Sequence, residues 1–164
     1  VCVEVNADVN LHLANAYRRQ QKWELARKHY QKALDEEILL PLKLGALINY
    51  GAFLQDLGEL GEAIQVYQAV IHIDPSQAIA FFNLAMIYKA QGNLLEAIKG
   101  YQEAITLQPD YAEAYQNLAV TSFKAGLIQE SVDAFQQAIA LYEQRQSPEA
   151  DRLRKNLQEM GLIA

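Results

Sequence analysis

The chain repeats its own pattern at a fixed interval of 34 residues. Ala63 is followed at that distance by Ala97, and Pro75 is followed at the same distance by Pro109. Two further sets recur with this step: Asn49, Asn83 and Asn117, and Gly58, Gly92 and Gly126. A constant period of this size indicates an array of similar units, each of which can bury its apolar side only against its neighbours.

Each unit has the pattern of two helices joined by a short turn. Between residues 78 and 111, large and small apolar residues recur at helical spacing on both sides of Gly92, which is suited to end the first helix. Pro109 follows the second helix and cannot continue it. The residues that define this unit are Phe81, Leu84, Ala85, Tyr88, Gly92, Ala97, Tyr101, Ala104 and Pro109.

These residues fall where the tetratricopeptide repeat (TPR) family has its large and small packing positions, and the family's period is roughly 34 residues. The chain therefore resembles a TPR protein over most of its length. The resemblance implies an all-α fold, an α-solenoid of stacked antiparallel helix pairs (a TPR superhelix), with the first helix of each pair on the concave side. Ser147 and Pro148 are suited to open one further helix, with Ala150, Leu153, Leu157 and Met160 on one face. We expect a single domain over 1–164, with repeats at 7–43, 44–77, 78–111 and 112–145 and a C-terminal capping helix at 147–160.

A short segment precedes the first repeat, and the repeat itself departs from the pattern in two places. Residues 1–6 are too few for a stable strand, and we expect a tail or a lead-in to the first helix. Gln21 stands where the other repeats have glycine, so its turn lacks the residue that adopts positive φ without steric cost. Extra residues near 37–41 either extend the second helix or form a longer loop, and Pro41 ends one helix or starts the next.

The fourth repeat departs in three other places. Ser131 replaces the small alanine, which is a tolerable change. Ser122 stands at the usual tyrosine position and Phe123 follows it, so we expect rearranged packing there. Glu143 stands where proline closes the other repeats, so the second helix should run longer.

Composition narrows the classes of function. The chain has 164 residues, of which 51% are hydrophobic and 21% charged, as in a globular domain. Its net charge of −6 argues against general nucleic-acid or anionic-membrane binding, because both need an excess of Lys and Arg. The lone Cys2 excludes an intrachain disulfide, and no apolar run approaches the roughly 20 residues of a membrane span. We expect a cytoplasmic location, although the start at Val1 is consistent with a piece of a longer protein.

The family places ligand-contacting residues on the concave side, on the first helix of each repeat. Carried over by position, the resemblance implies a peptide-binding groove that contains His12, Asn15, Arg19, Ile48, Asn49, Ala52, Phe82, Asn83, Met86, Lys89, Gln116, Asn117, Val120 and Lys124.

Asn49, Asn83 and Asn117 form a ladder with one member in each of three repeats. A carboxamide carries donors and an acceptor, so it can hold a peptide backbone without reading its sequence. This ladder resembles the groove of the TPR arm of O-linked N-acetylglucosamine transferases. The alternative is that each asparagine bonds to its neighbouring repeat.

Several apolar residues also stand at positions expected to face outward, and exposed apolar patches mark binding sites. Arg18 and Arg19 add positive charge, so the preferred ligand is a segment with apolar anchors and an acidic end. The alternatives are a solvated charged face and apolar residues that contact one another or the capping helix. A chaperone-type carboxylate clamp is a poor match, because Leu11 is not basic, although Asn15 and Asn49 fit it. The apolar residues concerned are Ile48, Ile79, Phe82, Met86 and Val120.

The sequence contains no catalytic constellation. His12, His29 and His72 stand in different places without metal-ligand spacing, and the glycines do not form a phosphate-binding loop. We therefore expect no enzyme activity and no cofactor. The preferred function is a protein–protein interaction scaffold that binds a peptide or helix of a partner. The alternative is a substrate-recruiting TPR arm of a larger enzyme such as a glycosyltransferase, and self-association is compatible with either.

Overall fold

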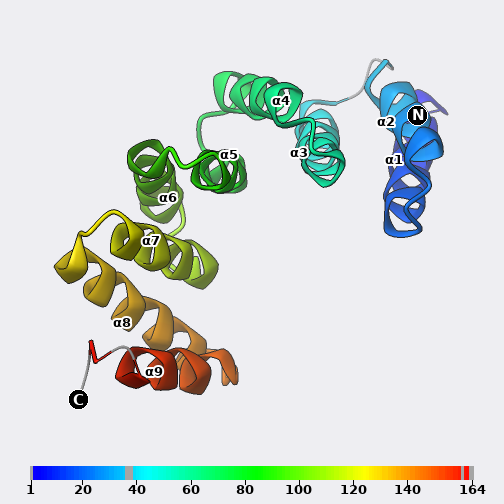
Figure 1. Ribbon diagram of the computed structural model, residues 1–164. Helices are drawn as coiled ribbons and strands as arrows, with labels where there is room; N and C mark the ends of the chain where they lie inside the picture. The colour runs from blue at the N-terminus through cyan, green and yellow to red at the C-terminus, as the bar shows by residue number, and fades with distance from the viewer. Residues whose placement is uncertain (1, 36–38, 160, 163–164) are drawn as a thin grey trace. The chain divides into compact units, whose positions relative to one another are not determined.

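The computed structural model describes residues 2–35, 39–159 and 161–162. Within these ranges every regular element is an α-helix, which confirms the predicted all-α solenoid with a C-terminal helix (Figure 1). The helices are α1 (Cys2–Arg19), α2 (Trp23–Asp35), α3 (Leu40–Leu57), α4 (Leu60–Ile73), α5 (Ala78–Ala90), α6 (Leu94–Leu107), α7 (Ala112–Lys124), α8 (Ile128–Gln144) and α9 (Glu149–Glu159).

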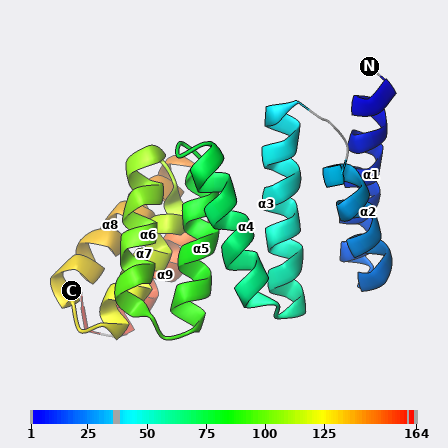
Figure 2. The same cartoon turned by 90° about the horizontal axis from the view of Figure 1, so that it is seen from above.

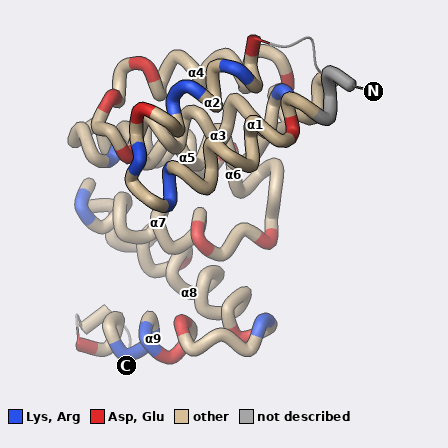
Figure 3. The backbone as a smooth tube through the Cα atoms, turned by 90° about the vertical axis from the view of Figure 1, so that its right-hand side faces the viewer, with Lys and Arg blue, Asp and Glu red and all other residues tan. Residues whose placement is uncertain are grey.

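The chain forms two compact units, Val1–Pro75 and Ser76–Ala164. Unit 1 contains α1 to α4, and unit 2 contains α5 to α9. Within unit 2, consecutive helices lie side by side, as Figures 1 and 2 both show for α5 to α8. Charged residues occur along both units (Figure 3). We call α1, α3, α5 and α7 the first helices and α2, α4, α6 and α8 the second helices.

Aromatic rings hold the two helix pairs of unit 1 together. The ring of Tyr30 on α2 lies 5.2 Å from that of Phe53 and 5.7 Å from that of Tyr50, both on α3. The ring of Trp23, at the start of α2, lies 6.3 Å from the ring of Phe53. Such offset or tilted ring contacts add to the free energy of burial, so this cluster joins the first repeat to the second.

The turns between paired helices share one backbone geometry. Gly58, Gly92 and Gly126 have φ values of 78°, 80° and 79°. Gln21 takes the same left-handed conformation with a φ of 58°, as its place in the repeat requires. The amide of Lys22 then donates to the carbonyl of Tyr17 at 2.9 Å, which satisfies an acceptor at the end of α1. A non-glycine residue pays a steric cost in this region.

Of the two expectations for the segment before the first repeat, a tail or a lead-in to the first helix, the described residues agree with the lead-in. Helix α1 already begins at Cys2, so residues 2–6 are its first turns. The inserted residues 36–38 lie outside the described residues. Pro41 belongs to the first turn of α3, where its missing amide hydrogen costs nothing, and so it starts a helix and does not end one.

Unit 2 has one apolar core that continues into α9. Ala150, Leu153 and Leu157 of α9 are buried in it, whereas Met160 lies outside the described residues. The hydroxyl of Ser147 accepts a hydrogen bond from the amide of Glu149 at 3.3 Å, at the start of this helix. Helix α8 runs for 17 residues where α6 has 14, as the missing proline predicts.

The packing of the fourth repeat is rearranged as predicted. Ser122 is fully buried and its hydroxyl has no partner among the described residues, while Phe123 is 37% exposed. Ser131 is also fully buried, but its hydroxyl donates to the carbonyl of Ala119 at 2.8 Å. The serine in the alanine position is therefore accommodated, and the serine in the tyrosine position leaves its polar group unsatisfied.

Tyr30, Tyr67 and Tyr101 occupy the same position in successive repeats, but their buried hydroxyl groups differ in hydrogen bonding. Tyr30 and Tyr67 are fully buried and donate to Asn15 and Gln55, each at 2.6 Å. The hydroxyl of Tyr101 is buried without a hydrogen-bond partner among the described residues, and burial raises the pKa of Tyr101 well above its ordinary value.

We therefore expect Tyr101→Phe to leave the free energy of unfolding unchanged or to raise it by up to about 1 kcal/mol, because it removes an unsatisfied buried hydroxyl. Tyr30→Phe should lower it by about 1 kcal/mol, because it leaves Asn15 without its donor. Urea denaturation of both variants measures the difference. The reverse order of stabilities would contradict the assignment of the two hydroxyl groups.

Candidate functional site

A polar pocket of about 390 Å³ lies between the first helices of unit 1. We call it the polar pocket. Its lining comes from α1 and α3 and is made of Asn15, Arg18, Arg19, Asn49 and Asp56. Three of these, Asn15, Arg19 and Asn49, belong to the predicted groove, so the fold brings them together.

An ion pair borders the polar pocket. Nε of Arg18 donates to Oδ2 of Asp56 at 2.6 Å, and the two side chains are 26% and 43% exposed. Burial alone would lower the pKa of Arg18, but the hydrogen bond and negative charge of Asp56 raise it on balance. Arg18 is therefore committed to Asp56, which leaves Arg19 as the basic group of the pocket without an ion-pair partner among the described residues.

The two asparagines of the polar pocket present free amide groups. The oxygen of Asn15 accepts the bond from Tyr30, and its amide nitrogen has no hydrogen-bond partner among the described residues. The side chain of Asn49 makes no hydrogen bond to the part of the chain that the structure describes. Together with Arg19, these groups offer hydrogen-bond donors to a carbonyl or carboxylate oxygen.

The other predicted groove residues of unit 1 lie outside this pocket. His12 is exposed and contacts the carbonyl of Asp8 on its own helix at 2.9 Å. Ile48 and Ala52 are half-buried.

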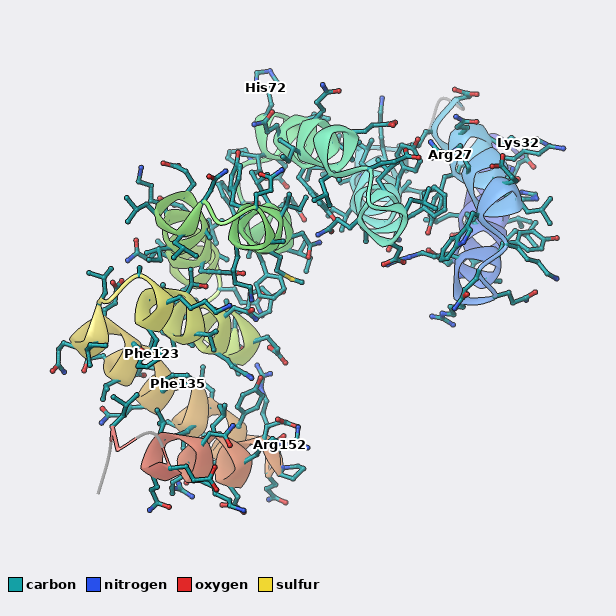
Figure 4. The ribbon with its side chains drawn as sticks, viewed as in Figure 1. Arg27, Lys32, His72, Phe123, Phe135 and Arg152 are labelled. Carbon is teal, nitrogen blue, oxygen red and sulfur yellow. The ribbon has the colours of Figure 1, made fainter. Side chains whose placement is uncertain are left out.

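An apolar pocket of about 260 Å³ opens in unit 2 between α7, α8 and α9. We call it the apolar pocket. Gln116, Val120 and Lys124 of the predicted groove are three of its lining residues. Phe123 and Phe135, labelled in Figure 4, come from neighbouring helices and line it too. The complete lining is Gln116, Val120, Phe123, Lys124, Phe135, Leu153, Asn156 and Leu157.

Two lysines of unit 2, Lys89 and Lys124, interact electrostatically. Nζ of Lys89 on α5 donates to Oδ1 of Asn117 on α7 at 2.5 Å, and Nδ2 of Asn117 donates to the carbonyl of Glu113 at 2.9 Å. Burial lowers the pKa of Lys89, and the charge of Lys124 lowers it further. The carboxamide of Asn117 is thus engaged on both sides, in part with the neighbouring repeat, whereas Asn83 makes no side-chain hydrogen bond to described residues.

Phe82 and Met86 have different environments although both stand at predicted groove positions. The ring of Phe82 lies 4.9 Å from that of Tyr111 and 5.7 Å from that of Tyr101, and it packs against the core of unit 2. Met86 is 38% exposed. Gln116 accepts a hydrogen bond from the hydroxyl of Tyr142 at 3.0 Å, which orients it at the edge of the apolar pocket.

Six residues that line the two pockets were not predicted as groove residues. Asp56 lies 38 residues from Arg18, and no spacing rule connects them. Leu153 and Leu157 carried a signal, the apolar face of an amphipathic helix, but it predicted only a cap. The sequence also contained a signal for Phe123, because its offset from the repeat pattern indicated rearranged packing. Phe135 stands at a core position of the repeat, and Asn156 carried no signal.

Two other kinds of feature are absent from the described residues. The described residues contain no group of three or more His, Cys, Asp or Glu residues placed to hold a metal ion. Among the described helices, none is both long enough and apolar enough to cross a membrane.

Comparison with known proteins identifies the repeats. Family models of the tetratricopeptide repeat match residues 7–37 and 76–144, and a further TPR repeat model matches residues 54–92. Among curated protein sequences, none matches the chain.

Solved structures share the fold. A crystal structure of MamA aligns with a TM-score of 0.73 at 24% identity, covering 85% of this chain and 80% of that chain. YrrB, described as a TPR protein with an unusual peptide-binding site, aligns with a TM-score of 0.71 at 18% identity, covering 93% and 74%. PilF of Pseudomonas aeruginosa aligns with a TM-score of 0.74 at 18% identity, covering 94% and 76%. At these identities the likeness concerns the fold alone.

Proposed function

Because the chain is built from tetratricopeptide repeats, we propose that it is a non-catalytic scaffold that binds a peptide or helix segment of another protein on its first helices. One observation supports this most: predicted first-helix residues line the pocket of each unit. Asn15, Arg19 and Asn49 do so in unit 1, and Gln116, Val120 and Lys124 do so in unit 2. YrrB, which shares the fold, is described as having a peptide-binding site.

The two pockets suit different parts of a polypeptide ligand. The polar pocket offers amide and guanidinium donors, which match backbone carbonyls and acidic side chains. The apolar pocket offers desolvated area for one side chain, which is where hot spots of binding free energy concentrate. Each pocket by itself suits a protein partner, and the net charge of −6 argues against nucleic acid and anionic membranes as partners.

Charge reversal on the first helices tests this function. The variant Arg19→Glu/Lys124→Glu changes one exposed first-helix residue in each unit. We expect it to reduce the recovery of specifically captured proteins by about tenfold when the immobilised full chain is exposed to a lysate of the source cell, because rim charges govern encounter and orientation. Mass spectrometry measures the recovery.

The matched control is Lys28→Glu/Lys99→Glu, which makes the same change of charge on exposed positions of the second helices α2 and α6. Its recovery should equal that of the wild type. Equal losses in the two double variants would contradict a site on the first helices.

A second candidate is a substrate-recruiting arm of a larger enzyme such as a glycosyltransferase. The spacing of Asn49, Asn83 and Asn117 favours it, and the free carboxamides of Asn49 and Asn83 could hold a peptide backbone. The bonds of Asn117 to Lys89 and to Glu113 weaken it. The reading frame that encodes the chain decides between the two candidates, since this one requires a catalytic region in the same frame.

Self-association is compatible with the scaffold function. Val9 and Leu13 on α1 are 50% and 38% exposed, so this helix has apolar side chains available to a further chain. Light scattering of the purified protein over a range of concentrations would detect such a partner.

A further inference from the structure

We propose that the apolar pocket, together with Lys89 and Lys124, recognises a partner segment in which a bulky apolar side chain is flanked by a carboxylate. The inference rests on the proposed scaffold function and specifies the chemistry of its ligand in unit 2. It depends on the shape of the pocket, on two lysines that form no ion pair within the described residues, and on their adjacency.

The size and lining of the pocket suit one side chain. At about 260 Å³ it is smaller than the roughly 300–1,000 Å³ of pockets that enclose a drug-sized ligand. Val120, Phe135 and Leu153 are among its apolar walls. Phe123 is 37% exposed, so a guest side chain would bury apolar surface that the chain itself leaves in water.

Lys124 lines this pocket, and Lys89 on α5 lies outside its lining. Neither Lys89 nor Lys124 forms an ion pair within the described residues. Burial lowers the pKa of Lys89, and the charge of Lys124 lowers it further. A carboxylate supplied by a ligand would be attracted to both ammonium groups.

The acidic side chains of the neighbouring helices have other partners. On α8, Glu143 pairs with Arg154, while Glu130 and Asp133 accept hydrogen bonds from Gln102 and Gln129. Helix α5 contains none, and Glu113 is the acidic residue of α7. Its carboxylate lies 3.7 Å from Nη1 of Arg145. On α9 the carboxylates contact basic residues of that helix, in the pairs Glu149 with Arg152, Asp151 with Arg154 and Glu159 with Lys155.

Lys124 connects the apolar pocket with the pair of lysines, so that they form one site. Lys124 lines the pocket and acts electrostatically on Lys89, whose Nζ is held by Asn117 on the same helix as Val120 and Lys124. A carboxylate that reaches both ammonium groups would therefore come from a residue next to the one whose side chain enters the pocket. This arrangement favours a short motif of one bulky apolar and one acidic residue.

Selection from a displayed library of random 12-residue peptides tests the proposal with the intact 164-residue chain as bait. We expect enrichment of peptides that place Asp or Glu close to Phe, Leu, Ile, Met or Trp. A selected peptide, made synthetically, is then titrated against the wild type and against variants by fluorescence anisotropy.

Two exposed substitutions at the site should weaken the selected peptide. Lys124→Glu replaces attraction by repulsion, and we expect the Kd to rise about tenfold, with a smaller difference at high salt. Asn156→Trp places a ring at the mouth of the pocket from an exposed position, and it should also raise the Kd about tenfold or more. Lys99→Glu on α6 is the matched control and should leave the Kd unchanged, and circular dichroism should show all variants folded.

The outcomes separate this inference from the function on which it rests. If peptides are enriched but lack acidic residues, or bind Lys124→Glu and Asn156→Trp as tightly as the wild type, the scaffold function stands and the proposed recognition is wrong. If the wild type enriches no peptide, both fail.

Discussion

Replacing Leu157 with alanine is expected to lower the free energy of unfolding by about 3 kcal/mol. Leu157 is 1% exposed and belongs to the core cluster of unit 2, although it stands on the last described helix of the chain. A truncated side chain there loses its transfer free energy and leaves a cavity beside Phe135 and Leu153, with which it lines the apolar pocket. Urea denaturation followed by circular dichroism measures the loss.

The neighbouring position supplies the control. Asn156→Ala changes an exposed residue of the same helix, so its effect on the free energy of unfolding should stay within about 0.5 kcal/mol. If Leu157→Ala proves as mild as Asn156→Ala, helix α9 would not be an integral part of the core of unit 2.

Replacing Gly100 with leucine is expected to lower the free energy of unfolding by about 2 to 3 kcal/mol. A Cβ atom at Gly100 would lie 2.8 Å from Cβ of Ala85 and 3.3 Å from the carbonyl oxygen of Phe81. Both atoms belong to the facing helix α5, so α5 and α6 would have to move apart. The better helix propensity of leucine offsets less than about 1 kcal/mol of this cost.

A second helical glycine, Gly45, tests the effect of helix propensity where no packing cost is expected. At Gly45 on α3 a Cβ atom would have no neighbour within 4 Å. Gly45→Ala should therefore leave stability unchanged or raise it by up to about 1 kcal/mol. Thermal and urea unfolding of both variants check this contrast, and a destabilised Gly45→Ala would contradict it.

The candidate site was predicted in part from the sequence. The period of 34 residues identifies the first helices, and Asn15, Arg19 and Asn49 lie together in the polar pocket of unit 1. Position along a helix decides which side a residue faces, so the repeat pattern is informative about such groupings. The same reasoning does not show that Phe82 contacts the rings of Tyr101 and Tyr111. The rotamer of Phe82 decides this contact, and the position of a residue on its helix does not fix its rotamer.

The polar partners within the site could not be predicted. Lys89 and Asn117 are 28 residues apart, and Arg18 and Asp56 are 38 apart, so neither pair follows the repeat period. Each hydrogen bond depends on the reach and direction of two long or branched side chains on different helices. These contacts decide whether a group is available to a ligand. They engage Asn117 and Arg18, whereas Asn49 and Arg19 have no polar partner among the residues that the structure describes.

The sequence by itself determined the helix pairs, their turns and the rearranged fourth repeat. These features are local, since each depends on a few consecutive residues. They include the helical periodicity, the glycine positions and the turn at Gln21, whose φ is 58°. Only the tertiary structure decided that α9 contributes Leu153 and Leu157 to a pocket with Phe123 and Lys124. That pocket exists because side chains from three helices leave space unfilled where they meet, and the repeat pattern of one helix contains no information about that space.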